Sequence, residues 1–255
     1  MATSSLAKAG ASGNGQKAVT NELKALQDPT ILANRVWLDS EWKKFEDGSQ
    51  TLDETLIGFR AWRISDGQDW AVRLNVPFNM SFAGDDPGGS DEQALGDIKL
   101  ATGTAVRLND TWRAGGGIEL RTPSGTNDAL SANTWRLKEI GAVAWDVNSW
   151  LTLSPSFEHS HSLAEQGNTA PEHFLELYFP ATFLLPERWA ITARYDTKID
   201  FNNDNARTHE AKLQVSKSLE SIPVGLSLSI KKPLDDDSNK DFQINFLSTV
   251  YSPWW

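Results

Sequence analysis

The sequence predicts an all-β protein, a 12-stranded antiparallel transmembrane β-barrel with short periplasmic turns and longer outer loops. Four tight polar turns are each followed at once by a tryptophan, Trp70, Trp112, Trp150 and Trp189, at intervals of about 40 residues. After each tryptophan the chain alternates between apolar and polar residues, which is the period of a strand with one apolar face. The tryptophans should therefore form a ring at one end of the strands. A membrane interface selects such a ring of amphipathic aromatic residues.

The barrel is expected to occupy residues 34–255 and to follow a flexible N-terminal segment, residues 1–33. A short helix is expected over 18–33 within that segment, and the Asp28-Pro29 pair should end or break it. A tilted membrane strand needs about 9–11 residues. Twelve segments of suitable length alternate in polarity: 34–45, 52–63, 70–80, 94–107, 112–121, 134–146, 150–161, 171–183, 189–199, 207–218, 223–232 and 241–254.

The connections between these strands also alternate in length. Five are short, and the others are mostly longer and richer in Gly, Asp, Asn and Ser. Bacterial outer-membrane barrels have short periplasmic turns, long outer loops and an even number of strands. Strands 34–45, 52–63, 134–146 and 171–183 alternate less cleanly, so bulges are expected in them. The short connections are 65–69, 109–111, 147–149, 184–188 and 219–222.

Composition excludes several classes of protein. The net charge of −10 argues against a nucleic-acid partner, which would need clustered Lys and Arg. The chain has no Cys, so it has no disulfide framework and no thiolate metal site. It has no apolar run long enough for a membrane helix, and its first residues lack the apolar stretch of a signal peptide. Either the protein is cytosolic or this is a mature chain whose leader was replaced by Met1, and the barrel pattern favours the second.

The polar faces of the strands carry charges of both signs, which suits a narrow wet lumen. In strand 112–121, for example, Arg113, Glu119 and Arg121 oppose Trp112 and Ile118. These charges predict a constriction that selects solutes by size and field. Two alternatives stay open: an ion-pair network that fills the barrel and conducts nothing, and a soluble β-sandwich or barrel with a solvated polar face. The predicted lumen-lining residues are Arg73, Lys99, Arg107, Arg113, Glu119, Arg121, Glu176, Arg194, Asp196, Lys198, Glu210 and Lys212.

Short motifs between Ala94 and Asp128 carry a resemblance to a family. They are Gly96-Asp97 at the start of a strand, a turn with Trp112, the Gly115–Gly117 strand, and the loop Thr122-Pro123-Ser124-Gly125. With the runs NRVWLDSEW and AVRLNVPF, this stretch resembles the outer-membrane transporter family of the "MetA-pathway of phenol degradation" type. The resemblance covers about residues 35–128, and it implies uptake of small, often hydrophobic compounds. It implies no catalytic residue.

The end of the chain is also typical of a barrel. Many barrel proteins end in an aromatic residue, and this chain ends in Trp254 and Trp255, after Pro253. A proline removes a donor from the strand ladder, so Pro253 marks the end of the strand or a bulge. The predicted membrane-interface aromatics are Trp70, Trp112, Trp150, Trp189, Trp254 and Trp255.

Three of the four histidines, His159, His161 and His173, fall in one predicted hairpin. His161 should lie opposite His173, and imidazoles at that distance could hold zinc or copper. The alternative is that these histidines only lie at the outer membrane interface and bind no metal. A lipid hydrolase would need a His and a Ser two residues apart on one face. Here Ser160 and Ser162 alternate with the histidines, so each His faces away from its neighbouring Ser.

We therefore expect a bacterial outer-membrane channel, porin-like and not an enzyme, that lets small molecules diffuse through a charged lumen. The N-terminal segment is expected to gate or seal it, or to be a tail without a role. The expected partners are outer-membrane lipid, lipopolysaccharide and a small-molecule solute, with no cofactor and no nucleic acid. A structural barrel, a lipid-modifying hydrolase barrel and a soluble β-barrel or sandwich that binds ligands remain alternatives.

Overall fold

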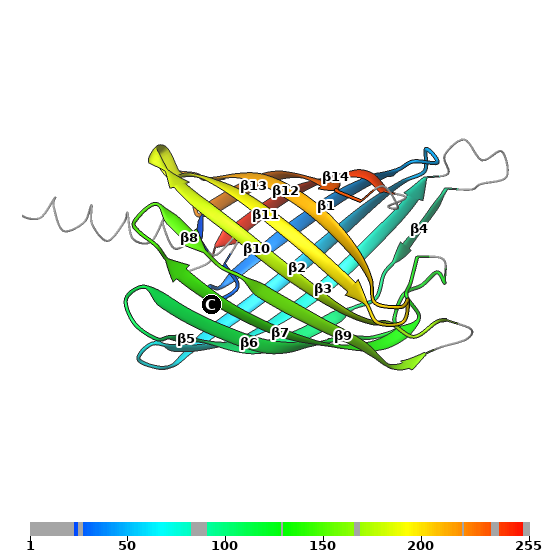
Figure 1. Cartoon of the computed structure of the whole chain (residues 1–255), viewed down its shortest axis with the longest axis horizontal. Helices are drawn as coiled ribbons and strands as arrows, with labels where there is room; N and C mark the ends of the chain where they lie inside the picture. The colour runs from blue at the N-terminus through cyan, green and yellow to red at the C-terminus, as the bar shows by residue number, and fades with distance from the viewer. Residues whose placement is uncertain are drawn as a thin grey trace, which may run out of the picture.

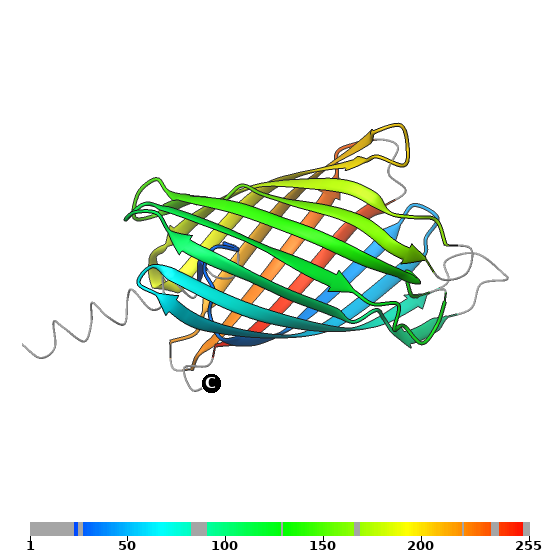
Figure 2. The same cartoon turned by 90° about the horizontal axis from the view of Figure 1, so that it is seen from below.

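The chain forms a closed antiparallel β-barrel with twelve strands in its wall (Figures 1 and 2). The computed structural model describes residues 23–24, 28–82, 91–128, 130–165, 169–220, 222–235 and 240–251. The prediction of a 12-stranded antiparallel barrel is confirmed. Within the described residues no helix is long and apolar enough to cross a membrane.

Fourteen strand segments make up the twelve wall strands, because two of the wall strands are interrupted. β4 and β5 both pair with β3, and β8 and β9 both pair with β7 and β10. A short 3-10 turn, η1 (Pro186–Arg188), joins β10 to β11. The segments are β1 (Arg35–Phe45), β2 (Gln50–Ser65), β3 (Gln68–Phe82), β4 (Glu92–Leu95), β5 (Lys99–Arg107), β6 (Trp112–Arg121), β7 (Thr134–Asp146), β8 (Leu151–Leu153), β9 (Ser156–Glu165), β10 (His173–Leu185), β11 (Trp189–Asp200), β12 (Ala206–Ser218), β13 (Val224–Pro233) and β14 (Lys240–Tyr251).

The first and last strands close the ring. β1 pairs with β14 from Arg35, opposite Tyr251, to Phe45, opposite Lys240. Each other wall strand pairs with its neighbours in the chain, so the ring is closed; the short β4 pairs on one side, with β3. A barrel that spans a membrane needs this closure, because lipid offers no partner to an unpaired backbone group.

In the part of the chain that the structure describes, irregularities occur at five places in the wall. Register shifts at Lys44/Phe45, Arg63/Ser65 and Trp135/Arg136 confirm the bulges expected in three of the less regular strands. The expectation for strand 171–183 is wrong, because β10 pairs with β11 in one register throughout. The break lies in the neighbouring strand instead, between β8 and β9. The predicted strand 94–107 is also interrupted, between β4 and β5.

The break between β8 and β9 has a simple cause in two prolines. Continuing the register of β10 with β8 and β9 places Pro180 opposite Ser154 and Pro155 opposite Phe179. Neither proline has a backbone N–H to give to the ladder. The carbonyl of Pro180 still accepts a hydrogen bond of 3.2 Å from the N–H of Ser154, and the carbonyl of Pro155 accepts one of 3.0 Å from Val143.

The barrel is polar inside and apolar outside, the reverse of a soluble protein. The largest side chains that are fully buried are threonines and serines, such as Thr134, Thr152, Thr249 and Ser160. The outer surface carries a large apolar side chain from every wall strand. An apolar band around the barrel is what lipid selects. One outward residue from each strand, all more than a third exposed, is Leu38, Leu56, Leu74, Leu100, Ile118, Val143, Phe157, Phe179, Tyr195, Leu213, Leu228 and Phe246.

The segment before β1 lies inside the barrel at the end that carries the short turns, where Figure 2 shows it in dark blue. Leu23 and Lys24 are helical, and the N–H of Asp28 donates to the carbonyl of Lys24 over 2.7 Å. The helix does not continue to residue 33 as expected, because the chain turns at Pro29 and Thr30 and is irregular up to β1. The predicted effect of the Asp28-Pro29 pair explains this end. The rest of the expected helix lies outside the described residues.

Candidate functional site

The interior of the barrel contains a cavity of about 550 Å³. Every one of the twelve wall strands contributes to its lining, and Asp28, Pro29, Ile31 and Leu32 of the segment before β1 line it too. The side chains therefore do not fill the barrel completely. This cavity is the candidate site.

One set of charges on the cavity wall forms a chain of ion pairs across β3, β6, β7 and β9. The Arg73 guanidinium donates to the Glu119 carboxylate over 2.5 Å. Lys138 lies 3.8 Å from Glu119 and 2.5 Å from Glu158. Each pair joins strands that are neighbours or are separated by one strand. The charges thus pair along the wall and leave the middle of the lumen free.

A second set follows the opposite wall. Asp196 accepts from Arg194 over 2.7 Å and lies 3.3 Å from Lys231, and Lys231 and Lys240 both pair with Glu210. This set runs from β11 to β14 and again joins only near neighbours.

The second wall continues onto β1 and β2. The Gln243 side chain donates to Glu41 over 2.7 Å, and Lys43 pairs with both Glu41 (2.6 Å) and Asp53 (2.7 Å). Together the two sets form what we call the charge belt, which consists of Arg73, Glu119, Lys138, Glu158, Arg194, Asp196, Glu210, Lys231, Lys240, Gln243, Glu41, Lys43 and Asp53.

Small residues on β5 and β6 keep one side of the lumen open. Gly103 faces Gly117 directly across the two strands, and both line the cavity. A Cβ on Gly117 would lie 2.4 Å from the carbonyl oxygen of Thr102, and one on Gly103 would lie 2.7 Å from the carbonyl oxygen of Gly116. The backbones of β5 and β6 approach too closely for a side chain at these two positions. The wall is therefore flat there, and the space that side chains would otherwise fill belongs to the cavity.

The predicted lumen residues fall into several groups. The cavity is lined by Arg73, Lys99, Glu119, Arg194 and Lys212. The charge belt also holds Asp196 and Glu210, whereas Arg113 and Arg121 belong to networks at the two ends of the barrel. Arg107 is exposed at the turn between β5 and β6, next to Arg113 of the facing strand. Glu176 lies opposite Lys198, whose ammonium sits 4.2 Å over the ring of Phe174.

Sequence reasoning missed eight of the thirteen residues of the charge belt. The missed residues are Lys138, Glu158, Lys231, Lys240, Gln243, Glu41, Lys43 and Asp53. Charged or polar residues stand next to each other in several of these strands, as in Lys138-Glu139 and Lys43-Lys44, so the alternation does not say which one faces inwards. The pairing register supplies that answer: Lys138 lies next to Ser160, which is fully buried, on the facing strand.

A network at the short-turn end holds the segment before β1 in place, and we call it the N-terminal anchor: Lys24, Asp28, Thr30, Arg113, Asp146 and Thr152. Arg113 donates to Asp28 (2.8 Å) and to Asp146 (2.6 Å), and Lys24 donates to Asp146 over 2.6 Å. Asp28 is 2 % exposed, and its other oxygen accepts from the N–H and the hydroxyl of Thr30. Arg113 was predicted to line the lumen, and here it joins the wall to the N-terminal segment.

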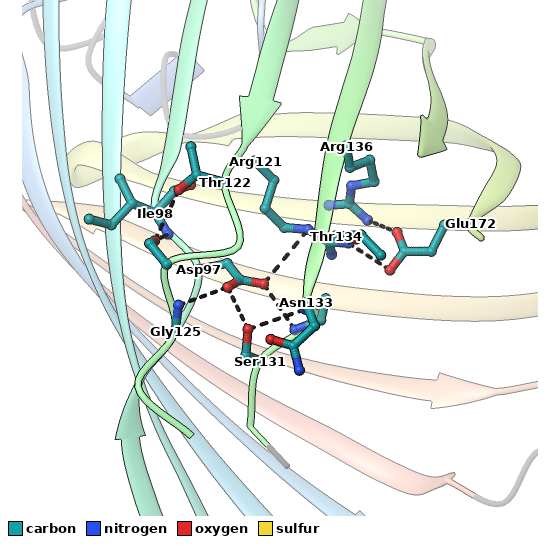
Figure 3. A network of polar contacts seen from close by, with 12 residues as sticks. Asp97, Ile98, Arg121, Thr122, Gly125, Ser131, Asn133, Thr134, Arg136 and Glu172 are labelled. Carbon is teal, nitrogen blue, oxygen red and sulfur yellow. Dashed lines mark hydrogen bonds and ion pairs between the residues drawn. The ribbon is translucent and has the colours of Figure 1, made fainter. Parts of the chain in front are cut away.

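A second network, at the loop end of the barrel, is centred on Asp97 and joins neighbouring loops to each other (Figure 3). Asp97, 5 % exposed, stands in the gap between β4 and β5 and accepts from Gly125 N (3.0 Å), Ser131 Oγ (2.6 Å) and Ala132 N (2.9 Å). In the same gap the N–H of Ile98 donates to Ser124 Oγ, in the loop after β6, over 2.9 Å. The Gly96-Asp97 and Thr122–Gly125 motifs are thus two halves of one structural unit.

Arg121 and Arg136 extend this network to the segment before β10, where Figure 3 shows both aimed at Glu172. Arg121 donates to Glu172 over 2.7 Å and Arg136 donates over 2.9 Å. Burial acts to raise the pKa of Glu172, but the hydrogen bond from Arg121 and the charge of Arg136 outweigh it, so the pKa lies below its usual value. Glu172 therefore stays ionised and holds the loop end together at neutral pH.

Outward-facing aromatic pairs mark the short-turn end. Trp62 stacks on Trp70 with ring centroids 4.9 Å apart, and Trp112 stacks on Trp145 at 5.4 Å and 4° between the planes. Trp150 stacks on Phe183 at 6.0 Å, and Trp189 lies under the ammonium of Lys217 at 4.6 Å. Trp62 and Trp145 were not predicted; each precedes a turn, whereas the prediction looked only at tryptophans that follow one. Trp254 and Trp255 lie outside the described residues.

All four histidines face outwards on one sector of the loop end. His161 lies opposite His173, as the hairpin register predicts. The Nε2 atoms of His159 and His173 are 3.1 Å apart, and Glu139 lies 3.0 Å from Nδ1 of His159. His209, on β12, contacts the Tyr195 hydroxyl at 2.6 Å. Within the described chain no three or more His, Asp or Glu side chains are arranged to hold a metal ion.

The hydrolase alternative finds no matching geometry in this hairpin. Ser160 is fully buried on the lumen side, and the hydroxyl of Ser162 accepts from the N–H of Glu172 over 2.8 Å. His159 and His161 lie on the opposite face of β9, which they share with the exposed Phe157.

Searches with family models and against curated protein sequences give no match. Solved structures do match. The COG4313 outer membrane channel from Pseudomonas putida F1 superposes with a TM-score of 0.75 at 12% identity, over 87% of this chain and 96% of that one. The NanC porin gives 0.62 at 11% identity (85% and 99%), and the CymD monoaromatic hydrocarbon channel gives 0.55 at 8% (91% and 93%).

The chain therefore has the fold of an outer-membrane β-barrel of the kind found in Gram-negative bacteria. The structures it resembles include channels and porins, and also autotransporter translocator domains. Its apolar exterior agrees with that class and with the predicted localisation. The resemblance to the "MetA-pathway of phenol degradation" family stays a prediction, because no family model matches.

Proposed function

We propose that the protein is an outer-membrane channel through which small molecules diffuse passively, and that its N-terminal segment narrows the lumen at the short-turn end. The observation that carries this proposal is the cavity of about 550 Å³, to which all twelve wall strands contribute. In this setting the partners of the protein are outer-membrane lipid and lipopolysaccharide on the outside and a small solute inside.

The pairing of the charges supports an open lumen over a filled one. If the interior served only to fill the barrel, side chains would pair across its diameter. In the charge belt each ion pair instead joins residues on one strand, on neighbouring strands or on strands separated by one other. The belt thereby satisfies the buried charges that a polar lumen requires and leaves room for water and solute.

The gating role rests on the N-terminal anchor. Residues Asp28 to Leu32 lie at one end of the cavity and narrow it. Arg113 and Asp146 hold them from the wall through hydrogen-bonded ion pairs. The anchor is polar and only partly dry, since Arg113 and Asp146 keep 14% and 17% of their side-chain surface exposed. Such pairs can break and re-form, which a gate needs and a permanent plug does not.

The solute class is a separate question, because the similar structures carry different solutes. One is a monoaromatic hydrocarbon channel, and another, the KdgM porin, was solved in complex with a disordered oligogalacturonate. The charged lining of the present lumen favours polar solutes over hydrocarbons.

The proposal is tested by planar-bilayer recordings of the purified full chain beside a variant that lacks residues 1–33. We expect stepwise currents from both, with a larger conductance or longer open times for the shortened form. Equal currents from the two would refute the gating role and keep the channel. Silence from both, with insertion shown by protease protection, would refute the channel and favour a structural barrel.

A further inference from the structure

The lumen carries more positive than negative charge, although the chain as a whole has a net charge of −10. Among the described residues that line the cavity, seven are basic and five are acidic. The acidic side chains are mostly taken up by basic neighbours: Glu119 contacts Arg73 and Lys138, and Glu158 contacts Lys138. The excess positive charge is therefore not spread evenly over the wall.

Two lysines are left over by this pairing. Lys99 on β5 and Lys212 on β12 line the cavity, and neither has a hydrogen bond or an ion pair within 4 Å among the residues that the structure describes. Both residues are half-buried, and a charge without a partner is costly where it is withdrawn from water. Cationic groups left unpaired in a wet, enclosed space favour anions in that space.

The topology places these two lysines on opposite walls. Going round the closed ring from β5 to β12 in either direction, the two strands are six wall strands apart. Arg73 and Lys138 flank Lys99 on its side of the lumen, and Arg194 and Lys231 flank Lys212 on the other. A solute that crosses the cavity therefore passes between two basic surfaces.

Two acidic groups lie near Lys212, and one of them, Asp196, is already paired with Arg194 and Lys231. Asp39 also lines the cavity, and its carboxylate accepts a hydrogen bond of 2.5 Å from the Asn245 side chain. Asp39 has no cation within 4 Å in the described chain, so it offsets part of the field of Lys212. Glu119 is the acidic group near Lys99, and it is already paired with Arg73 and Lys138.

We propose that the lumen is selective for small anions, such as carboxylates, and that Lys99 and Lys212 are the residues that attract them. This inference rests on the proposed channel function and adds its solute class. Pores for anions and phosphate are lined by Lys and Arg in the same way.

The test is the reversal potential of the full chain in a planar bilayer under a KCl gradient. We expect wild type to prefer chloride over potassium. The double variant Lys99→Gln/Lys212→Gln should lose that preference. The permeability ratio should drop on the order of fivefold, because an ion beside either wall loses the attraction of one unit charge at about 4 Å in water. Inorganic phosphate and citrate should reduce the chloride current of wild type more than that of the double variant.

A matched control is Lys232→Gln, which removes one positive charge from the exposed outer face of β13, next to the inward-facing Lys231. It should leave the permeability ratio unchanged. A conducting wild type that prefers potassium, or a double variant with the wild-type ratio, would overturn the anion proposal alone. Absence of any current from wild type would overturn the channel function as well, so the two failures can be told apart.

Discussion

Asp28→Asn should release the N-terminal segment from the wall of the barrel. Asparagine keeps the oxygen that accepts from the N–H and hydroxyl of Thr30, so the local turn survives. It replaces the oxygen that accepts from Arg113 over 2.8 Å by an amide group that can only donate. A hydrogen bond to a charged group contributes about 1.5–3 kcal/mol. The held state should therefore lose about 10- to 150-fold in population relative to the released state.

Two measurements read this shift. Single-channel recordings should show a higher open probability or larger steps for Asp28→Asn than for wild type, and a protease added from the short-turn side should cleave the N-terminal segment faster. Asp47→Asn serves as the control, because it removes the same charge from an exposed turn at the opposite end of the barrel. If Asp28→Asn equals wild type in both conductance and cleavage rate, the N-terminal anchor does not hold the segment and the reasoning is wrong.

Three further outcomes follow from the structure. Each is measured as the temperature at which the folded barrel unfolds, which a detergent gel reports as a shift in the mobility of its band. Gly117→Ala forces a methyl against the carbonyl of Thr102 and should cost about 1–3 kcal/mol of stability; an unchanged transition would refute the close approach of β5 and β6. Asp97→Ala leaves the N–H groups of Gly125 and Ala132 without their acceptor and should cost about 1–3 kcal/mol for each donor left dry, whereas a cost near zero would mean that the loop after β6 is held by other contacts. Because the pKa of Glu172 is lowered in the folded barrel, its stabilisation is complete above the unfolded pKa of about 4.3 and is lost as the pH falls through the lower folded value; Glu172→Gln should remove this acid-dependent loss, and a variant that loses stability in acid as wild type does would contradict the assignment.

The strands could be predicted from the sequence because their information is local. Trp112 followed by alternating residues to Arg121 marks β6 to the residue, since lipid outside and water inside impose period two on each strand. The pairs in the lumen could not be predicted in this way. The partner of Arg73 is Glu119, 46 residues away and two strands further round the wall, and only the register and tilt of the closed barrel bring them together.

The interruptions of the wall show a second limit. Pro155 and Pro180 are visible in the sequence, but a single proline does not say whether the strand ends, bulges or skips a position. They break the ladder because the register brings both to the same place between β8/β9 and β10. Likewise, the Gly96-Asp97 pair looks like the opening of a strand. In the structure this pair forms a gap between β4 and β5, and residues of the gap hydrogen-bond with the loop after β6.

The sector of outward histidines has a consequence for the surrounding bilayer. Glu139, His159, His161 and His173 interrupt the apolar exterior on β7, β9 and β10, and His209 does so on β12, whereas β13 and β14 carry Leu228, Ile230 and Phe246 on their outer face. The hydrophobic thickness of the barrel is therefore unequal around its circumference. A bilayer whose hydrocarbon thickness matches the side with β13 and β14 is too thick for the side with the histidines. The mismatch is relieved by local thinning of the bilayer or by a tilt of the barrel axis. A barrel with a preferred tilt also presents one fixed side to its neighbours in the membrane.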